Sequence, residues 1–327
     1  MAKIQIKNLS VNDTVMGELL VTTASVRKTK TGKLYVDATL TDGVSSINAK
    51  RWDCDVAPTP GVYTVAATVG EYSGAKQLTI TSEFLLADAD ITVFAPSRNY
   101  DINAAWEVLL ASDRSLGDES TPLRQFIKEL VIDRKEQWMQ CTAAVGMHHV
   151  QTGGLVQHTA EVVLLATSMA TAISAYTHNN ALIDTGLITA GAMLHDIGKL
   201  ETYAANASTA QFERTVIGVL NEHITIGVAM LQSSKAAKKY PQVALLLEHI
   251  ITSHHGHTEY GSPVEPCCCE AYIVHFADNL SATYDTLAKA YEDTAENATF
   301  TDKVFGYNRK FLTPTAIHKM LTAHIAE

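Results

Sequence analysis

A histidine and an aspartate stand side by side at His195-Asp196, in a stretch that otherwise predicts a buried helix. Apolar residues precede the pair at helical spacing, from Leu182 to Leu194. A buried carboxylate without a partner is costly in free energy, so the fold must supply partners for this pair. A divalent metal ion pairs with both side chains at once. We therefore expect further metal ligands elsewhere in the chain.

Histidine and charge divide the chain into two parts. All 13 histidines lie at or after His148, so we expect the metal chemistry there. Residues 1–88 contain nine Lys/Arg and nine Asp/Glu, and the net charge of −10 therefore arises from the remainder. A negative charge argues against a general nucleic-acid-binding protein, but the neutral N-terminal part leaves that function open.

Length and composition favour two domains in a cytoplasmic protein. The 327 residues are 46% hydrophobic, which is enough for a full core. The sequence lacks a run of about 18 apolar residues, and its first residues lack the apolar core of a signal peptide. We therefore expect no membrane partner. Of the five cysteines, three are consecutive (Cys267, Cys268 and Cys269), which favours reduced thiols over disulfides.

Residues 1–88 predict a five-stranded β-barrel of the OB type. From Leu34 to Leu40, apolar side chains alternate with Tyr35, Asp37 and Thr39, as in a half-buried strand. Gly-rich turns separate segments of similar character, which is the rhythm of a small barrel. The predicted strands are 14–26, 34–40, 44–52, 62–71 and 76–85.

OB barrels commonly bind single strands by combining cations with aromatic faces. The alternative is a solvated Lys-rich hairpin with Trp52 in the core. The candidate nucleic-acid-binding residues are Arg27, Lys28, Lys30, Lys33, Tyr35, Lys50, Arg51, Trp52 and Lys76.

The rest of the chain predicts helices. A helical connector is expected over residues 89–146 and an all-α domain over 147–327. The predicted helices are 101–111, 121–144, 155–177, 181–200, 216–231, 241–253, 270–291 and 314–325.

Two sets of candidate metal ligands lie on these helices. His158 and Asp278 have apolar neighbours at helical spacing, so both point inward and complete a four-ligand set with His195 and Asp196. His223, His254 and His255 indicate a second site that shares Asp196 as a bridge. Paired metals suit phosphoryl displacement, and a mixed N/O set suits Mn, Fe, Co, Ni or Zn. His249 is a candidate for supporting the ligands.

The order His158, His195-Asp196, Asp278 resembles the HD phosphohydrolase superfamily. Longer strings narrow the resemblance to YhaM-type 3′→5′ exoribonucleases, which join an OB domain to an HD domain. These strings are His148-His149-x4-Gly153-Gly154-Leu155-x2-His158-Thr159, Leu194-His195-Asp196-Ile197-Gly198-Lys199 and Ser253-His254-His255-Gly256.

This resemblance implies a multidomain α and β protein, with an N-terminal OB barrel followed by an HD domain. It implies a metal-dependent 3′→5′ exonuclease that hydrolyses single-stranded RNA. Mn is the first candidate metal, and single-stranded DNA is a second candidate substrate. Asp196 would bridge two ions, and Lys199 would stabilise phosphate oxygens or protonate the leaving group. His148 and His149 would line the substrate path or serve the structure.

Other functions stay open on sequence grounds. An HD phosphohydrolase could act on nucleotides or cyclic dinucleotides, and a di-iron oxygenase would use a similar helical ligand set. A single-strand-binding protein with a structural HD domain is the non-enzymatic alternative. The oligomeric state is also open, a homo-oligomer included.

Overall fold

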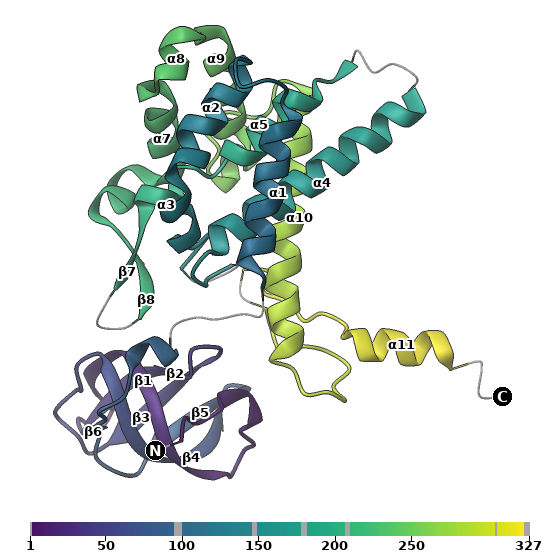
Figure 1. Cartoon of the computed structure of the whole chain (residues 1–327). Coiled ribbons are helices and arrows are strands. Elements are labelled where there is room, and N and C mark those ends of the chain that lie inside the picture. Colours follow the sequence, from purple (N-terminus) through teal and green to yellow (C-terminus); the bar gives the residue numbers. More distant parts are fainter. Residues whose placement is uncertain are drawn as a thin grey trace. The chain divides into compact units, whose positions relative to one another are not determined.

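Two compact units make up the chain (Figure 1). The computed structural model describes residues 2–94, 100–145, 149–177, 182–206, 210–304 and 306–323. One unit comprises residues 1–98 with 205–211, and the other comprises 99–204 with 212–327. Each has its own hydrophobic core. The finer limits at residues 88 and 146 stay predictions.

The first unit contains a closed five-stranded barrel, which confirms the prediction. The strand order is β1-β2-β3-β5-β4, and β4 pairs again with β1 to close the barrel. The β3–β5 pair is parallel, whereas the other pairs are antiparallel. The strands are β1 (Thr14–Lys28), β2 (Leu34–Thr41), β3 (Ser46–Trp52), β4 (Gly61–Tyr72) and β5 (Ala75–Ile80), with a short β6 (Leu85–Leu86) on β4.

Strand β1 is long enough to pair with two neighbouring strands. Its first half pairs with β4 and its second half with β2, and the register shifts between Val21 and Thr23. Such an irregularity bends a strand and helps a barrel to close. The predicted strand 76–85 is too long, since β5 ends at Ile80. Beyond it, the Ser82 hydroxyl accepts a hydrogen bond from the Ala66 amide at 3.0 Å, in place of a carbonyl of the ladder.

The second unit is built from helices around one core. Its largest buried side chains include Trp138, Phe126 and Leu109. The helices are α1 (Ile102–Ser115), α2 (Pro122–Leu130), α3 (Lys135–Gln140), α4 (Gly154–Thr177), α5 (Thr185–Leu194), α6 (Lys199–Thr202), α7 (Val216–Ser233), α8 (Lys235–Lys239), α9 (Pro241–Ser253), α10 (Cys269–Glu292) and α11 (Pro314–Thr322).

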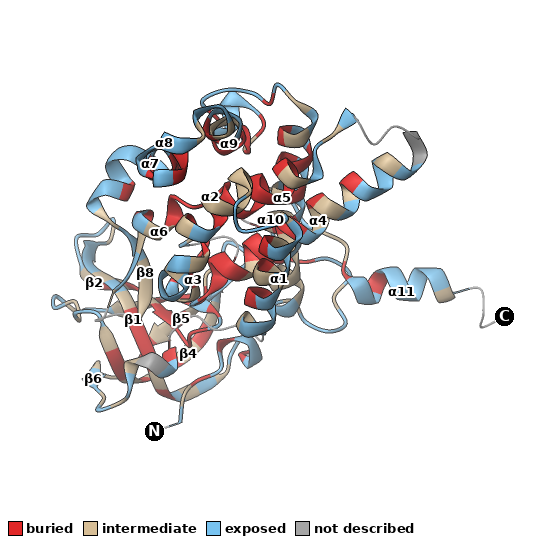
Figure 2. Ribbon diagram, turned by 45° about the horizontal axis from the view of Figure 1, so that its top comes forward, coloured by how far each residue is buried: buried red, intermediate tan, exposed pale blue. Residues whose placement is uncertain are grey.

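Helix α5 forms the centre of this unit. Every residue from Leu187 to Leu194 is buried, and the helix packs on α2, α4, α9 and α10 (Figure 2). The prediction of one helix over 181–200 is wrong, because α5 ends at Leu194 and His195–Gly198 form a turn. A Cβ on Gly198 would lie 1.9 Å from the His223 carbonyl oxygen, so only glycine fits where this turn meets α7.

Two further segments differ from the prediction. The segment 121–144 is divided, because the Trp138 indole donates to the Leu130 carbonyl at 3.1 Å and folds α3 back on the end of α2. A short hairpin, β7 (Tyr203–Asn206) with β8 (Gln211–Arg214), interrupts the helices. Across the described ranges, no helix has the length and apolar character needed to span a bilayer.

Candidate metal centre

Five segments bring the predicted ligands together. His158 lies in the first turns of α4, and His195 and Asp196 follow the last residue of α5. Helix ends suit this arrangement because adjacent side chains can turn toward one site. The remaining ligands come from α7, from the end of α9 and from α10: they are His223, His254, His255 and Asp278.

The first cluster contains His158, His195 and Asp278, with one ligand atom from each within 4.8 Å of the others. His158 Nε2 lies 3.1 Å from Asp278 Oδ1 and 3.3 Å from His195 Nε2. His195 Nε2 lies 3.8 Å from the same carboxylate oxygen. Two ring nitrogens and one oxygen therefore converge on one point.

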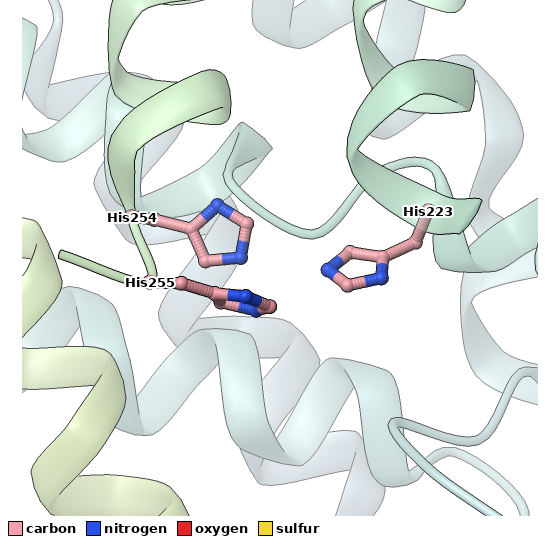
Figure 3. Close-up of side chains that lie close together, drawn as sticks. All are labelled: His223, His254 and His255. Atoms are coloured by element: carbon pink, nitrogen blue, oxygen red, sulfur yellow. The ribbon is translucent and has the colours of Figure 1, made fainter. Parts of the chain in front are cut away.

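The second cluster contains His223, His254 and His255, again with ligand atoms within 4.8 Å of one another. Figure 3 shows the two neighbouring rings facing His223 across a gap. Helix α7 departs from helical geometry at Glu222, whose φ is 57° and ψ 158°. This break immediately precedes His223, so it helps to set the direction of that ring.

Asp196 lies between the two clusters. Its Oδ2 is 3.4 Å from His158 Nε2 and 3.3 Å from His195 Nε2. Its Oδ1 is 3.6 Å from the Nε2 atoms of both His223 and His254. The two oxygens of one carboxylate thus face different clusters, which is the geometry of a bridging ligand.

Backbone carbonyls fix the protons of three rings. The Nδ1 atoms of His195, His254 and His255 lie 2.8, 2.8 and 3.0 Å from the carbonyl oxygens of Ala192, Ile251 and Tyr260. A carbonyl only accepts, so each Nδ1 carries the hydrogen and each Nε2 of the neutral ring keeps its lone pair. Histidines that bind metals show this pattern.

Buried polar atoms without hydrogen-bond partners mark the centre of the site. In the part of the chain that the structure describes, Asp196 Oδ1, His223 Nε2 and His254 Nε2 have none. A buried group left in this state costs about 1–3 kcal/mol. A divalent cation would remove that cost at all three atoms, so the donor set fits such an ion.

Electrostatic surroundings keep His223 and His254 neutral and Asp196 ionised. Burial lowers the pKa of His223 to about 3 and that of His254 well below its ordinary value, so both rings are neutral. Burial raises the pKa of Asp196, but the charge of Lys199 and the contacts with His195 and His158 outweigh it and hold the pKa well below the usual range. Asp196 is therefore ionised.

Lys199 closes one side of the site. Its Nζ lies 2.6 Å from Asp196 Oδ2, and the residue is only 6% exposed. Burial lowers the pKa of Lys199, but Asp196 raises it by more, so the ammonium stays charged. An adjoining cavity of about 220 Å³ is lined by Asp196, Lys199, His255, Tyr260, His275, Asp278, Asn279 and Ala282.

Comparison with known proteins matches this architecture. The model of the HD domain matches residues 155–283, which contain all seven candidate ligands. The 3′-5′ exoribonuclease YhaM of Bacillus subtilis is 30% identical, over 94% of this chain and 97% of its own length. The chain belongs to the YhaM exoribonuclease family.

Two further YhaM relatives agree. The protein from Bacillus licheniformis is 29% identical over 92% of this chain and 95% of its own length. The protein from Bacillus velezensis is 30% identical over 87% of this chain and 90% of its own length. No solved structure matches. The HD domain binds divalent metal, in agreement with the two clusters.

Three further histidines were predicted for this YhaM-family site, and the two that the structure describes lie outside the clusters. His148 falls outside the residues that the structure describes. His149 is 1% exposed and its Nε2 lies 3.2 Å from Glu161, so its ring is packed behind His158 and away from solvent. His249 Nε2 accepts a hydrogen bond from the Cys267 amide at 2.9 Å, near the start of α10.

Three residues near the site were missed by the sequence reasoning. Glu161 lies three positions after His158, and both His275 and Ser281 lie three positions from Asp278. That spacing places each on the same helix face as a ligand, which was an available signal. His275 Nδ1 donates to the His254 carbonyl at 2.7 Å and so supports the turn that presents His254 and His255.

The barrel of this YhaM-family chain has an aromatic cluster around Lys50. Its Nζ lies 5.5, 5.7 and 5.1 Å from the ring centroids of Tyr35, Trp52 and Tyr72. Trp52 is 47% and Tyr72 66% exposed, so Trp52 is not a core residue. Sequence reasoning missed Tyr72, which lies at the far end of β4 and joins the cluster only in the folded barrel.

The predicted cations of the barrel differ in their surroundings. Lys28 and Lys30 are exposed on the β1–β2 side. Lys76 Nζ donates to the Leu9 carbonyl. The remaining three have carboxylate partners: Arg27 with Asp37 at 3.1 Å, Lys33 with Asp53 at 3.5 Å and Arg51 with Glu83 at 3.9 Å.

Proposed function

We propose that this chain is a metal-dependent 3′→5′ exoribonuclease that hydrolyses single-stranded RNA. The observation that carries the proposal is Asp196, whose two oxygens face two separate histidine clusters. The curated relatives are named 3′-5′ exoribonuclease, and they match the chain along nearly its whole length.

The clusters divide the ligands into two sets. His158, His195, Asp196 and Asp278 would hold one divalent ion, and Asp196, His223, His254 and His255 the other. When bound, such ions make water acidic enough to ionise near neutral pH and offset charge on phosphoryl oxygens. Manganese is our proposed metal, because the mixed nitrogen and oxygen donors suit a transition ion.

Lys199 is proposed to stabilise the reacting phosphate. Its ammonium borders both Asp196 and the cavity, so a phosphodiester held there meets a fixed positive charge. Its raised pKa makes the ammonium a weak acid. Electrostatic stabilisation of a phosphoryl oxygen therefore fits Lys199 better than protonation of the leaving group.

The cavity suits the end of a strand. Its volume of about 220 Å³ is small, whereas pockets for drug-sized ligands measure roughly 300–1,000 Å³. Tyr260 lines the wall and is 65% exposed, so its ring can stack on an unpaired base. A site for one terminal nucleotide agrees with removal of nucleotides from an end.

The barrel is proposed to hold the rest of the strand. Trp52 and Tyr72 offer stacking faces, and Lys50 places a positive charge beside them. Base stacking on aromatic rings tolerates any sequence, which suits a processive or general nuclease. The barrel would thus raise the local concentration of substrate for an acidic catalytic unit.

Substitution of Asp196 tests the function. With Mn²⁺ present, the wild type should shorten single-stranded RNA from its 3′ end, as seen with substrates labelled at the 5′ or the 3′ terminus. Asp196→Ala should lose essentially all of this activity, because both ligand sets lose their shared oxygen donor. Undiminished activity in this variant would contradict the assignment, as would cleavage of small phosphodiesters without any shortening of RNA.

A further inference from the structure

A group of polar residues lies behind His158, on the side away from the two clusters. His158 Nδ1 is 3.0 Å from Ser281 Oγ, and Ser281 donates to Glu161 Oε2 at 2.7 Å. His149 Nε2 lies 3.2 Å from the same Glu161 oxygen. Ser281 and His158 are 2% and 0% exposed, so water does not substitute for these contacts.

The hydrogen bonds in this group run in one direction. Burial raises the pKa of Glu161, but hydrogen bonds and charge, His149 first among them, lower it by more, to about 2. Glu161 is therefore a carboxylate, which only accepts. Ser281 gives its single hydroxyl proton to Glu161, so its Oγ is left to accept from His158 Nδ1–H.

We propose that Ser281 and Glu161 are positioning residues that fix the tautomer and orientation of His158 for metal binding. With Nδ1 committed to Ser281, Nε2 is the ring nitrogen left to bind a cation, and it faces Asp196 Oδ2 at 3.4 Å and Asp278 Oδ1 at 3.1 Å. Carboxylates behind metal-binding histidines generally act in this way, and here a serine hydroxyl stands between the two. The inference rests on the proposed function, because it assumes that His158 is a ligand.

A nucleophilic role for Ser281 is excluded by burial. Ser281 Oγ lies 3.5 Å from His149 Nε2, and His149 Nδ1 lies 3.9 Å from Asp285 Oδ1, which resembles the residue order of a hydrolase triad. All three residues are at most 2% exposed, so a substrate cannot reach the hydroxyl. The hydroxyl proton also goes to Glu161 rather than to His149.

His158 offers a test that three of the other histidines, His195, His254 and His255, do not. His195, His254 and His255 are oriented by backbone carbonyls, which substitution does not remove. His158 is oriented by a side chain. Ser281→Ala removes that acceptor and leaves all seven proposed ligands in place.

The measurement is Mn²⁺ binding to the full-length chain, followed by the electron paramagnetic resonance signal of free Mn²⁺. Ser281→Ala should weaken binding of one ion roughly 10- to 100-fold, as loss of such support does at other metal sites. The matched control is Thr189→Ala, which deletes another buried hydroxyl whose bond goes to the Thr185 carbonyl. The control should bind Mn²⁺ as the wild type does.

Glu161→Gln is the second variant, and it decides the matter if Ser281→Ala does not fold. It keeps the side-chain shape but removes the anion, and binding of one ion should weaken by about tenfold. Wild-type affinity in the folded variants would overturn the inference. Failure of the wild type to bind Mn²⁺ would instead overturn the proposed function, so the two failures are distinguishable.

Discussion

At the scale of single residues, the site depends on one carboxylate reached from two sides. Asp196 meets four imidazoles and one ammonium within 3.6 Å of its two oxygens. Such a group is stable in the interior only because its neighbours are cationic or able to share a cation. Burial keeps His223 and His254 neutral, so each ring offers a lone pair to such a shared cation.

The pH dependence of stability tests the environment of Glu161. Its folded pKa of about 2 lies below the ordinary value of 4.5. The depressed pKa adds stability that is fully present above pH 4.5 and is lost as pH falls toward 2. Glu161→Gln should therefore lower the free energy of unfolding by about 3 kcal/mol at neutral pH, and this deficit should shrink below pH 4.5.

Denaturant unfolding of the metal-free wild type and variant, repeated at several pH values, measures this difference. The comparison cancels the titration of other carboxylates, which both proteins share. A deficit that stays constant between pH 7 and pH 3 would show that the Glu161 charge is not the cause.

The proposed ligands stand out in the sequence, whereas the tertiary contacts that support them do not. His158, His195 and Asp278 stand out because ionisable side chains on apolar helix faces need partners. Ser281 meets Glu161 only because α10 packs on α4, and that contact is tertiary information. A serine or a glutamate on a helix is otherwise unremarkable in a single sequence.

At the scale of elements, most of the proposed ligands lie at helix ends or beside a helix break. Proposed ligands directly follow the last residue of α5, the last residue of α9 and the break in α7. The barrel strands were predictable because alternation follows directly from which face is buried. The end of α5 was harder to predict from sequence, because it depends on the close approach of Gly198 to α7.

The break in α7 predicts a stabilising substitution. Glu222 has a φ of 57° and ψ of 158°, a region that is essentially restricted to glycine. Glu222→Gly should raise the free energy of unfolding by about 1 kcal/mol, because it removes strain. The ion pair of Glu222 with Arg214 is largely exposed, so its loss lowers the free energy of unfolding only slightly.

Glu222→Ala is the matched control for thermal or denaturant unfolding. It also loses the ion pair with Arg214 but keeps a Cβ in the strained conformation. The Glu222→Gly variant should therefore be more stable than both the Glu222→Ala variant and the wild type. Equal stability of the glycine and alanine variants would contradict the presence of strain at Glu222.

At the scale of the whole molecule, the net charge differs between the N-terminal part and the rest of the chain. The net charge is −10, and residues 1–88 contribute none of it. In the proposed function, an acidic catalytic part would repel RNA, so attraction of the strand would fall to the metal ions and to the barrel. A neutral barrel predicts modest affinity and a shallow dependence on salt.

The aromatic cluster of the barrel should govern binding of long strands. Trp52→Ala should weaken binding of a long single-stranded RNA roughly tenfold, because one stacking face is lost. Cleavage of very short oligoribonucleotides should be unchanged, since the proposed function has these bind at the metal centre alone. Fluorescence anisotropy and initial rates measure the two effects separately.

The contribution of the Lys50 charge to RNA binding can be tested against a matched control variant. Lys50→Ala should weaken binding of the long strand, whereas Lys7→Ala removes an exposed charge elsewhere on the barrel and should have little effect. Equal losses in the two variants would indicate a general charge effect in place of a defined binding site.

Metal stoichiometry tests the central claim most directly. After saturation with Mn²⁺ and removal of free ions, the wild type should retain two ions per chain. His158→Ala and His223→Ala should each retain one, because each removes a ligand from a different set. Asp196→Ala should retain neither, since both sets depend on its oxygens. A folded Asp196→Ala variant that still holds two ions would contradict the account.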